Sequence, residues 1–182
     1  MRGFTLWLTG PSPALAASVA RRVEEALLER GMAVEFVGGD EVRERLGAGP
    51  GDPAEARAAC ARRVGFVCRL LSRNGVAAIA AEPLAPAPLR DELRAAIERL
   101  VEVELRGSAE ATAGTADAPG SGPESERTHV VSVAGEGGED GAVRAIVSLL
   151  EALGHVPGIG GGGYLAEEEE AIKARLRDLG YI

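Results

Sequence analysis

Short apolar segments alternate with longer helix-forming segments along most of this 182-residue chain. Residues 76–81, VAAIAA, are continuously small and apolar, as is typical of a strand buried on both faces of a parallel sheet. Successive parallel strands need a crossover between them, usually a helix, so the alternation predicts an α/β fold with helices on both sides of one sheet. We predict strands over 4–9, 33–37, 76–81, 101–105 and 129–133, and helices over 13–30, 40–46, 53–73, 87–100 and 140–153.

The first strand–helix junction has the frame of a phosphate-binding loop. Residues 4–20, FTLWLTGPSPALAASVA, pass from a strand through a Thr-Gly pair into a helix. An ATP-binding loop of the form G-x-x-x-x-G-K-[ST] belongs at such a junction. Counting from Gly10, the second glycine falls on Leu15, the lysine on Ala16 and the hydroxyl residue on Ala17. Spacing alone leaves two interpretations open, a degenerate phosphate loop and an unrelated strand–turn–helix without a ligand.

The residues of this loop lack the chemistry that holds phosphate. A phosphate loop binds through backbone N–H groups at a helix N-terminus, and Pro11 and Pro13 each lack that group. Ala16 cannot reach the β- and γ-phosphates as a lysine would, and Ala17 has no hydroxyl for Mg²⁺. Ser18 carries a hydroxyl one position later, which a helix turns by about 100°. Because each charge-assisted contact contributes roughly 1.5–3 kcal/mol, we expect ATP affinity to fall by orders of magnitude.

The charge balance excludes several classes of partner. The chain has 28 acidic and 20 basic residues and a net charge of −8, which argues against nucleic acid and anionic membrane surfaces. A small anionic ligand in a local basic pocket stays compatible with it. Cys60 and Cys68 lie about 12 Å apart on one predicted helix, too far for a disulfide. Without paired ligands near the two histidines we expect no metal site, and without a long apolar run we expect a cytoplasmic protein.

The sequence changes character after the fourth predicted strand. Residues 107–127 have almost no large apolar side chain and predict a flexible, lid-like loop. Residues 157–163, PGIGGGG, predict a flexible linker, and residues 164–182 predict an amphipathic helix with an acidic first turn. That helix could pack back on its own domain or dock a protein partner. The predicted organisation is one domain over 1–156, a Gly-rich linker and a C-terminal helix.

Further motifs bear on the chemistry. GFTLWLTG precedes the loop, VEFVGGDEVR covers 34–43, and RRVGFVCRLLSRNGV covers 62–76. Together they resemble adenylylsulfate kinase, also called APS kinase, closely over 1–106 and more loosely over 128–156. The resemblance implies a P-loop NTPase-like three-layer sandwich with a five-stranded parallel sheet, extended here by the C-terminal amphipathic helix. It implies Mg-ATP as cosubstrate, γ-phosphate transfer to the 3′-hydroxyl of adenosine 5′-phosphosulfate in sulfate assimilation, and a homodimer.

The match of individual residues is uneven. The family's phosphate loop, G-L-S-G-x-G-K-S-T, is kept at two positions and has a serine in place of its threonine. Asp40 matches the family's catalytic aspartate, while Arg43 and Arg57 match substrate-binding arginines. Asp40 could instead cap a helix, and each arginine could be a solvated helix charge. The candidate residues of the degenerate phosphate loop are Gly10, Ser12, Leu15, Ala16, Ala17 and Ser18.

These motifs leave three functions open. The first is a degenerate APS kinase-like protein, catalytically impaired, that binds a nucleotide, a phosphosulfate ligand or a protein partner. The second is an active adenylylsulfate kinase, and the third is an interaction module that uses its C-terminal helix. Phosphoryl transfer depends almost wholly on positioning and charge stabilisation, so the loss of lysine, hydroxyl and a basic lid favours the first.

Overall fold

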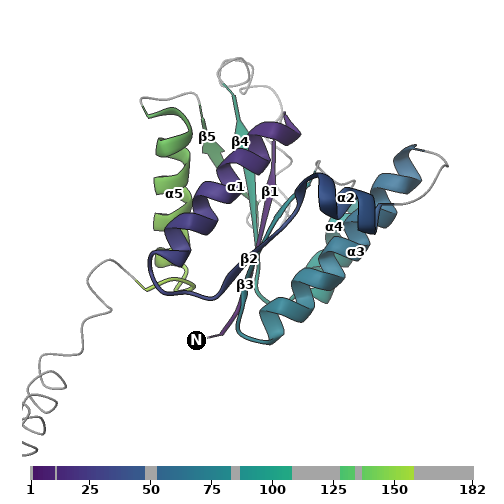
Figure 1. The fold of residues 1–182 in the computed structure, drawn as a ribbon, viewed down its shortest axis with the longest axis horizontal. Helices are drawn as coiled ribbons and strands as arrows, with labels where there is room; N and C mark the ends of the chain where they lie inside the picture. Colours follow the sequence, from purple (N-terminus) through teal and green to yellow (C-terminus); the bar gives the residue numbers. More distant parts are fainter. Residues whose placement is uncertain are drawn as a thin grey trace, which may run out of the picture.

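Five parallel strands form one sheet within the residues that the computed structural model describes, which are 2–10, 12–47, 53–82, 87–107, 128–133 and 137–157. The strand order is β2-β3-β1-β4-β5, with β1 at the centre (Figure 1). The predicted α/β fold with a five-stranded parallel sheet is therefore confirmed. The elements are β1 (Thr5–Thr9), α1 (Pro13–Leu28), β2 (Val34–Val37), α2 (Gly39–Leu46), α3 (Pro53–Arg73), β3 (Ala77–Ala81), α4 (Ala87–Ala96), β4 (Leu100–Arg106), β5 (Thr128–Ser132) and α5 (Gly138–Ala152).

Helices cover both faces of the sheet, because successive side chains of a strand point to opposite faces. On β1, Leu6 and Leu8 belong to a core shared with α1 and α5, while Trp7 belongs to a second core shared with α3 and α4. Figure 1 shows the corresponding layers, with α1 and α5 on one side of the strands and α3 and α4 on the other. This arrangement is the three-layer sandwich that the alternating sequence predicts.

The helix before β4 is shorter than its sequence pattern predicts. We expected a helix over 87–100, but α4 ends at Ala96 and Leu100 already belongs to β4. The amide of Thr5 donates to the carbonyl of Arg99 at 2.9 Å, and Leu100 pairs with Thr5 in the parallel ladder. Pairing with the central strand therefore takes these residues from the helix.

Close packing of α3 on α4 depends on one glycine. A Cβ atom added to Gly65 would lie 2.4 Å from Cδ2 of Leu93 and 3.9 Å from the Trp7 ring. Gly65 therefore lets the two helices approach each other over the second core.

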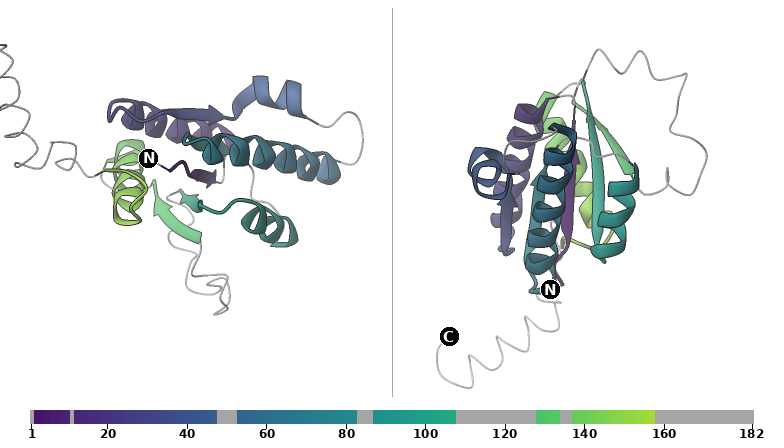
Figure 2. Two further views of the ribbon diagram at one scale, coloured as in Figure 1. Left: turned by 90° about the horizontal axis from the view of Figure 1, so that it is seen from below. Right: turned by 90° about the vertical axis from the view of Figure 1, so that its right-hand side faces the viewer.

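The first and last described segments meet at the amino-terminal edge of the sheet. Seen from below in Figure 2, the chain's N-terminus lies beside the end of α5. The rings of Phe4 and His155 stack there, with centroids 5.1 Å apart.

The predicted lid-like loop, linker and C-terminal helix fall mainly on residues 108–127 and 158–182, outside the described part of the chain. None of the described helices is long and apolar enough to span a bilayer.

Candidate functional site

The candidate site lies at the carboxyl-terminal edge of the sheet. The strand order places β1 between β3 and β4, and the chain leaves β1 toward one side of the sheet and later builds β4 and β5 on the other. Ligands of open α/β sheets bind outside the carboxyl ends of the strands, at such a reversal of strand order. The predicted phosphate loop follows β1, and the segment with Asp40 and Arg43 follows β2, so both predicted parts belong to this edge.

The β1–α1 connection is short, because α1 begins three residues before the position of the expected lysine. Ser12 is the N-cap, with φ −130° and ψ 126°, and Pro13 is the first helical residue. The amide of Leu15 donates to Oγ of Ser12 at 3.4 Å, and the amide of Ala16 donates to the carbonyl of Ser12 at 3.1 Å. Residues that a phosphate loop would keep open thus form the first turn of a helix.

The next positions of the loop point into packed or occupied surroundings. Ala16 is 2% exposed and packs in the core between the sheet, α1 and α5. Oγ of Ser18 donates to Oε2 of Glu139 at 2.6 Å, so the hydroxyl that stands for the family's threonine already has an acidic partner on α5. Arg22, one turn further along α1, pairs with Asp140 of the same acidic turn.

Sequence reasoning missed this junction of α1 with α5. Ser18 and Arg22 are four residues apart and therefore share a helix face. Their partners, Glu139 and Asp140, lie in the first turn of a helix more than a hundred residues later. The i,i+4 spacing indicates that Ser18 and Arg22 share a helix face, but no sequence pattern indicates that this face contacts α5.

Mg·ATP does not fit the residues present at this junction. Two of the N–H donors of the first turn, those of Leu15 and Ala16, bind the cap residue Ser12, and Pro13 has no N–H. The carboxylate of Glu139, which accepts a hydrogen bond from Ser18, adds negative charge near the first turns of α1 and so disfavours a phosphate group there.

The acceptor side of the predicted site is built from α2 and α3. The side chains of Asp40 and Arg43 lie outside what the structure describes, although their backbone belongs to α2. Arg57 is exposed near the start of α3. Nη1 of Arg63 donates to the carbonyls of Leu46 and Gly47, at 2.8 and 2.9 Å. This arginine fixes the end of α2 against α3, which keeps the segments that carry the predicted site residues together.

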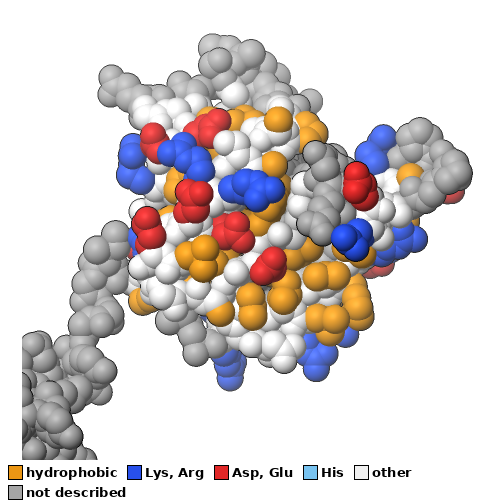
Figure 3. Space-filling view, viewed as in Figure 1, with side chains coloured by type: hydrophobic (Ala, Val, Ile, Leu, Met, Phe, Trp, Pro, Cys, Tyr) orange, Lys and Arg blue, Asp and Glu red, His pale blue; other side chains and the backbone are white. Residues whose placement is uncertain are grey.

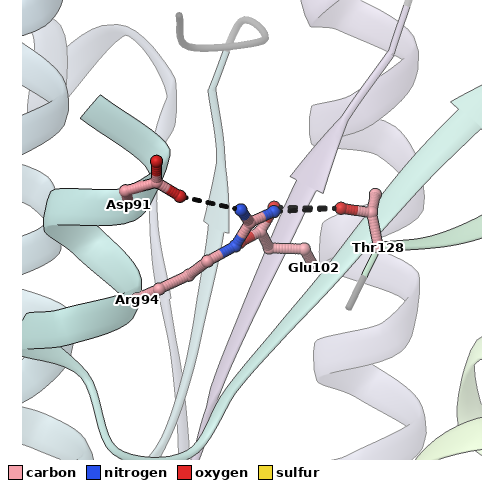
Figure 4. A network of polar contacts seen from close by, with 4 residues as sticks. All are labelled: Asp91, Arg94, Glu102 and Thr128. Atoms are coloured by element: carbon pink, nitrogen blue, oxygen red, sulfur yellow. Dashed lines mark hydrogen bonds and ion pairs between the residues drawn. The ribbon is translucent and has the colours of Figure 1, made fainter. Parts of the chain in front are cut away.

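A buried ion-pair network on the second face of the sheet is a further feature that sequence reasoning missed (Figure 4). Arg94 donates to both carboxylate oxygens of Glu102, at 2.6 and 2.9 Å, and also contacts Asp91 and Thr128. The hydrogen bonds from Arg94 to Glu102 raise the pKa of the guanidinium above its ordinary value. The network joins α4, β4 and β5, so we assign it a structural role.

The fold and the loop frame define this chain as a P-loop kinase-type α/β protein. Its structure resembles the hexameric APS kinase from Thiobacillus denitrificans with a TM-score of 0.66 and 29% identity, over 85% of this chain and 30% of that chain. It resembles the Mycobacterium tuberculosis APS kinase in complex with AMPPNP and APS with a TM-score of 0.62 and 26% identity, over 82% and 98% of the two chains. The adenylylsulphate kinase family model matches residues 2–120, more than half of the chain. The chain belongs to the adenylylsulphate kinase family.

Curated relatives agree with this assignment. The adenylyl-sulfate kinase of Rippkaea orientalis is 41% identical over 102 residues, which are 56% of each chain. A probable bifunctional SAT/APS kinase 2 of Sorangium cellulosum is 35% identical over 176 residues, covering 86% of this chain and 30% of that protein. The chain thus spans about half, or less, of the length of these relatives.

Proposed function

We propose that this chain is an adenylylsulfate kinase-like protein in which phosphate transfer from ATP is lost or strongly reduced. The observation that carries the proposal is the capped start of α1, where Ser12 occupies the amides of Leu15 and Ala16. A phosphate loop needs those donors and a lysine to hold the β- and γ-phosphates. Because each charge-assisted contact contributes roughly 1.5–3 kcal/mol, losing two or three weakens ATP binding by several orders of magnitude.

Isothermal titration of the full chain with Mg·ATP tests this proposal. We expect no heat of binding at micromolar concentrations of ligand and protein. Circular dichroism of the same sample, showing a folded protein, guards against a false negative. Binding of Mg·ATP with a sub-micromolar dissociation constant would contradict the proposal that the loop is degenerate.

We also propose that the acceptor side keeps an anion site for adenosine 5′-phosphosulfate or a related nucleotide, to which Arg43 and Arg57 contribute, with Asp40 as the catalytic candidate. Arginine suits this role because its planar guanidinium binds phosphate and sulfate oxygens in a bidentate way. The contact of Arg63 with the end of α2 supports the proposal, since it holds α2 on α3 without a ligand.

A thermal-shift panel with ATP, ADP, adenosine 5′-phosphosulfate and its 3′-phosphorylated product tests the acceptor site. A ligand at a hundred times its dissociation constant adds about 2.7 kcal/mol to the free energy of unfolding. We expect the phosphosulfate ligands to stabilise the chain and Arg57→Ala to remove most of that effect. Arg144→Ala, which alters an exposed arginine on α5, is the matched control and is expected to keep it.

The second candidate function is an active adenylylsulfate kinase. The names of relatives that are 35–41% identical to this chain favour it. A coupled assay for ADP production with adenosine 5′-phosphosulfate distinguishes the two proposals. Turnover by the unaltered chain that disappears in Asp40→Ala would establish the active enzyme. If the unaltered chain turns over no faster than Asp40→Ala, the result supports an impaired one.

A further inference from the structure

A basic cleft opens at the amino-terminal edge of the sheet, the edge opposite to the phosphate loop. Its volume is about 900 Å³, within the range of ligand and peptide pockets. It lies where the chain enters β1 and where α3 and α4 end. Four arginines and one glutamate are its charged lining residues: Arg2, Arg69, Arg73, Arg99 and Glu98. Figure 3 shows Lys or Arg side chains along the corresponding lower edge of the molecule.

Most of the positive charge of this cleft has no ion-pair partner within the described residues, since Glu98 is the single acidic lining residue against four arginines. Arg2, Arg69 and Arg73 have no acidic side chain within ion-pair distance there, although the whole chain carries a net charge of −8. Arg99 contacts the ring of His155, with Nη2 2.5 Å from Nδ1. Like charges around one cleft repel one another, and an anion placed between them relieves that repulsion.

The sequence carries an acidic segment shortly after the residue that contacts this cleft. His155 touches the cleft residue Arg99, and the described part of the chain ends two residues later. The sequence then continues with the Gly-rich stretch 158–163 and, after three residues, with Glu167–Glu170. A Gly-rich connection of about ten residues has a root-mean-square span of roughly 16–19 Å, and fully extended it reaches about 33 Å. The four glutamates are thus tethered within reach of the four arginines.

We propose that Glu167–Glu170 dock in this basic cleft and hold the C-terminal segment against its own domain. Each exposed ion pair contributes at most about 1 kcal/mol, so several are needed together. The short tether compensates for weak single contacts, because it gives the acidic segment a millimolar effective concentration at the cleft. A free anion and the acidic segment of a second copy are the competing occupants.

Zero-length cross-linking of the full chain tests the docking. Lys173 is the chain's one lysine, so Lys173→Arg gives a lysine-free background. In that background Arg73→Lys keeps the charge of the cleft and supplies an amine for carbodiimide coupling to carboxylates. We expect mass spectrometry to find peptides that join position 73 to residues 167–170, and 0.5 M salt to suppress them. Arg144→Lys on α5 is the matched control and is expected to give less than a tenth of that yield.

An equal mixture of ¹⁴N- and ¹⁵N-labelled protein separates the competing occupants. Cross-links within one isotope support docking inside the chain, whereas mixed-isotope peptides assign the cleft to a second copy and overturn the proposal. A yield no higher than that of the Arg144→Lys control also overturns it.

Competition with inorganic pyrophosphate provides a second measurement. The fourfold variant E167Q/E168Q/E169Q/E170Q leaves the cleft free, so pyrophosphate is expected to bind it at least about fivefold more tightly than the unaltered chain. Equal affinity of the two proteins, or binding to neither, contradicts an occupied anion-binding cleft.

Discussion

At the residue scale, the environment of Ala16 decides whether a lysine placed at this position could bind ATP. In the family pattern a lysine stands here, yet this position is 2% exposed and its amide bonds to the carbonyl of Ser12. The missing lysine side chain is therefore one of two features that support the proposed weak binding of ATP. The capped first turn of α1 is the second feature, because the amides of Leu15 and Ala16 already donate to Ser12.

Restoring the lysine alone is predicted to fail. We expect Ala16→Lys to lower the free energy of unfolding by about 3 kcal/mol, since it adds volume and an unpaired charge to a packed core. Mg·ATP binding, measured by calorimetry, is expected to stay absent. Ala14→Lys, at an exposed position of the same turn, is the control and should change stability by less than about 0.5 kcal/mol. Micromolar ATP binding by Ala16→Lys with unchanged stability would show that the cap does not block the loop.

The buried thiol of Cys68 gives a second prediction at this scale. Burial, with a smaller contribution from Glu82, raises the pKa of Cys68 to about 12. Only about one molecule in ten thousand then carries the reactive thiolate at pH 8. In a Cys60→Ser background we expect iodoacetamide to modify folded protein at least a hundredfold more slowly than protein in urea. Equal rates would mean that Cys68 is accessible in the folded chain.

At the scale of elements, the position of α4 depends on contacts that its sequence does not reveal. Arg94 and Glu102 are each about 10% exposed and join α4 to β4 by paired hydrogen bonds. Trp7, the register partner of Glu102 on β1, lies in the core on that same face. The ion pair therefore closes the second layer of the sandwich at the side of β4 and β5.

Removing one partner of this pair is predicted to destabilise the fold. Glu102→Gln leaves the Arg94 guanidinium without its buried carboxylate, so we expect a loss of about 3 kcal/mol, with Asp91 keeping a smaller contact. Urea denaturation measures the change. Glu92→Gln breaks a pair with Arg62 whose side chains are both 52% exposed, and is expected to cost less than about 1 kcal/mol. Similar losses in the two variants would contradict the role of burial.

At the scale of the whole molecule, the two ends of the described chain contact each other at the amino-terminal edge of the sheet. His155, after α5, stacks on Phe4 before β1 and contacts Arg99 before β4. Burial and the positive charge of Arg99 lower the pKa of His155 below its ordinary value.

Global stability is therefore predicted to fall on mild acidification. Because the unfolded chain binds the His155 proton more readily, the free energy of unfolding decreases as the pH falls from neutrality through the ordinary histidine pKa of about 6.5. His155→Gln is expected to show a smaller decrease between pH 7.5 and 6. Arg99→Gln, which removes the second cause, is expected to give an intermediate decrease. Parallel pH profiles for all three proteins, from urea denaturation, would contradict this assignment.

Local patterns in the sequence determined most of the architecture. Continuous apolar runs and helical periodicity predicted the five parallel strands and the helices to within a few residues, because both periods follow from backbone geometry. The end of α4 was placed too late, since residues 97–100 suit a helix locally while pairing with β1 needs Leu100 extended. The sequence also shows directly that Ala16 and Ala17 stand where the family's phosphate loop has a lysine and a hydroxyl residue.

Only the tertiary structure decided which distant groups meet. It joined Ser18 to Glu139 and Arg63 to the end of α2, and it gathered arginines from separate segments around one cleft. These contacts bring together residues far apart in the chain, for which no local period exists. The sequence alone determined a parallel sheet and a β1–α1 loop without the family's lysine. The sequence also predicted that α1 begins at Pro13, while the folded chain showed that Ser12 caps it and accepts hydrogen bonds from the amides of Leu15 and Ala16.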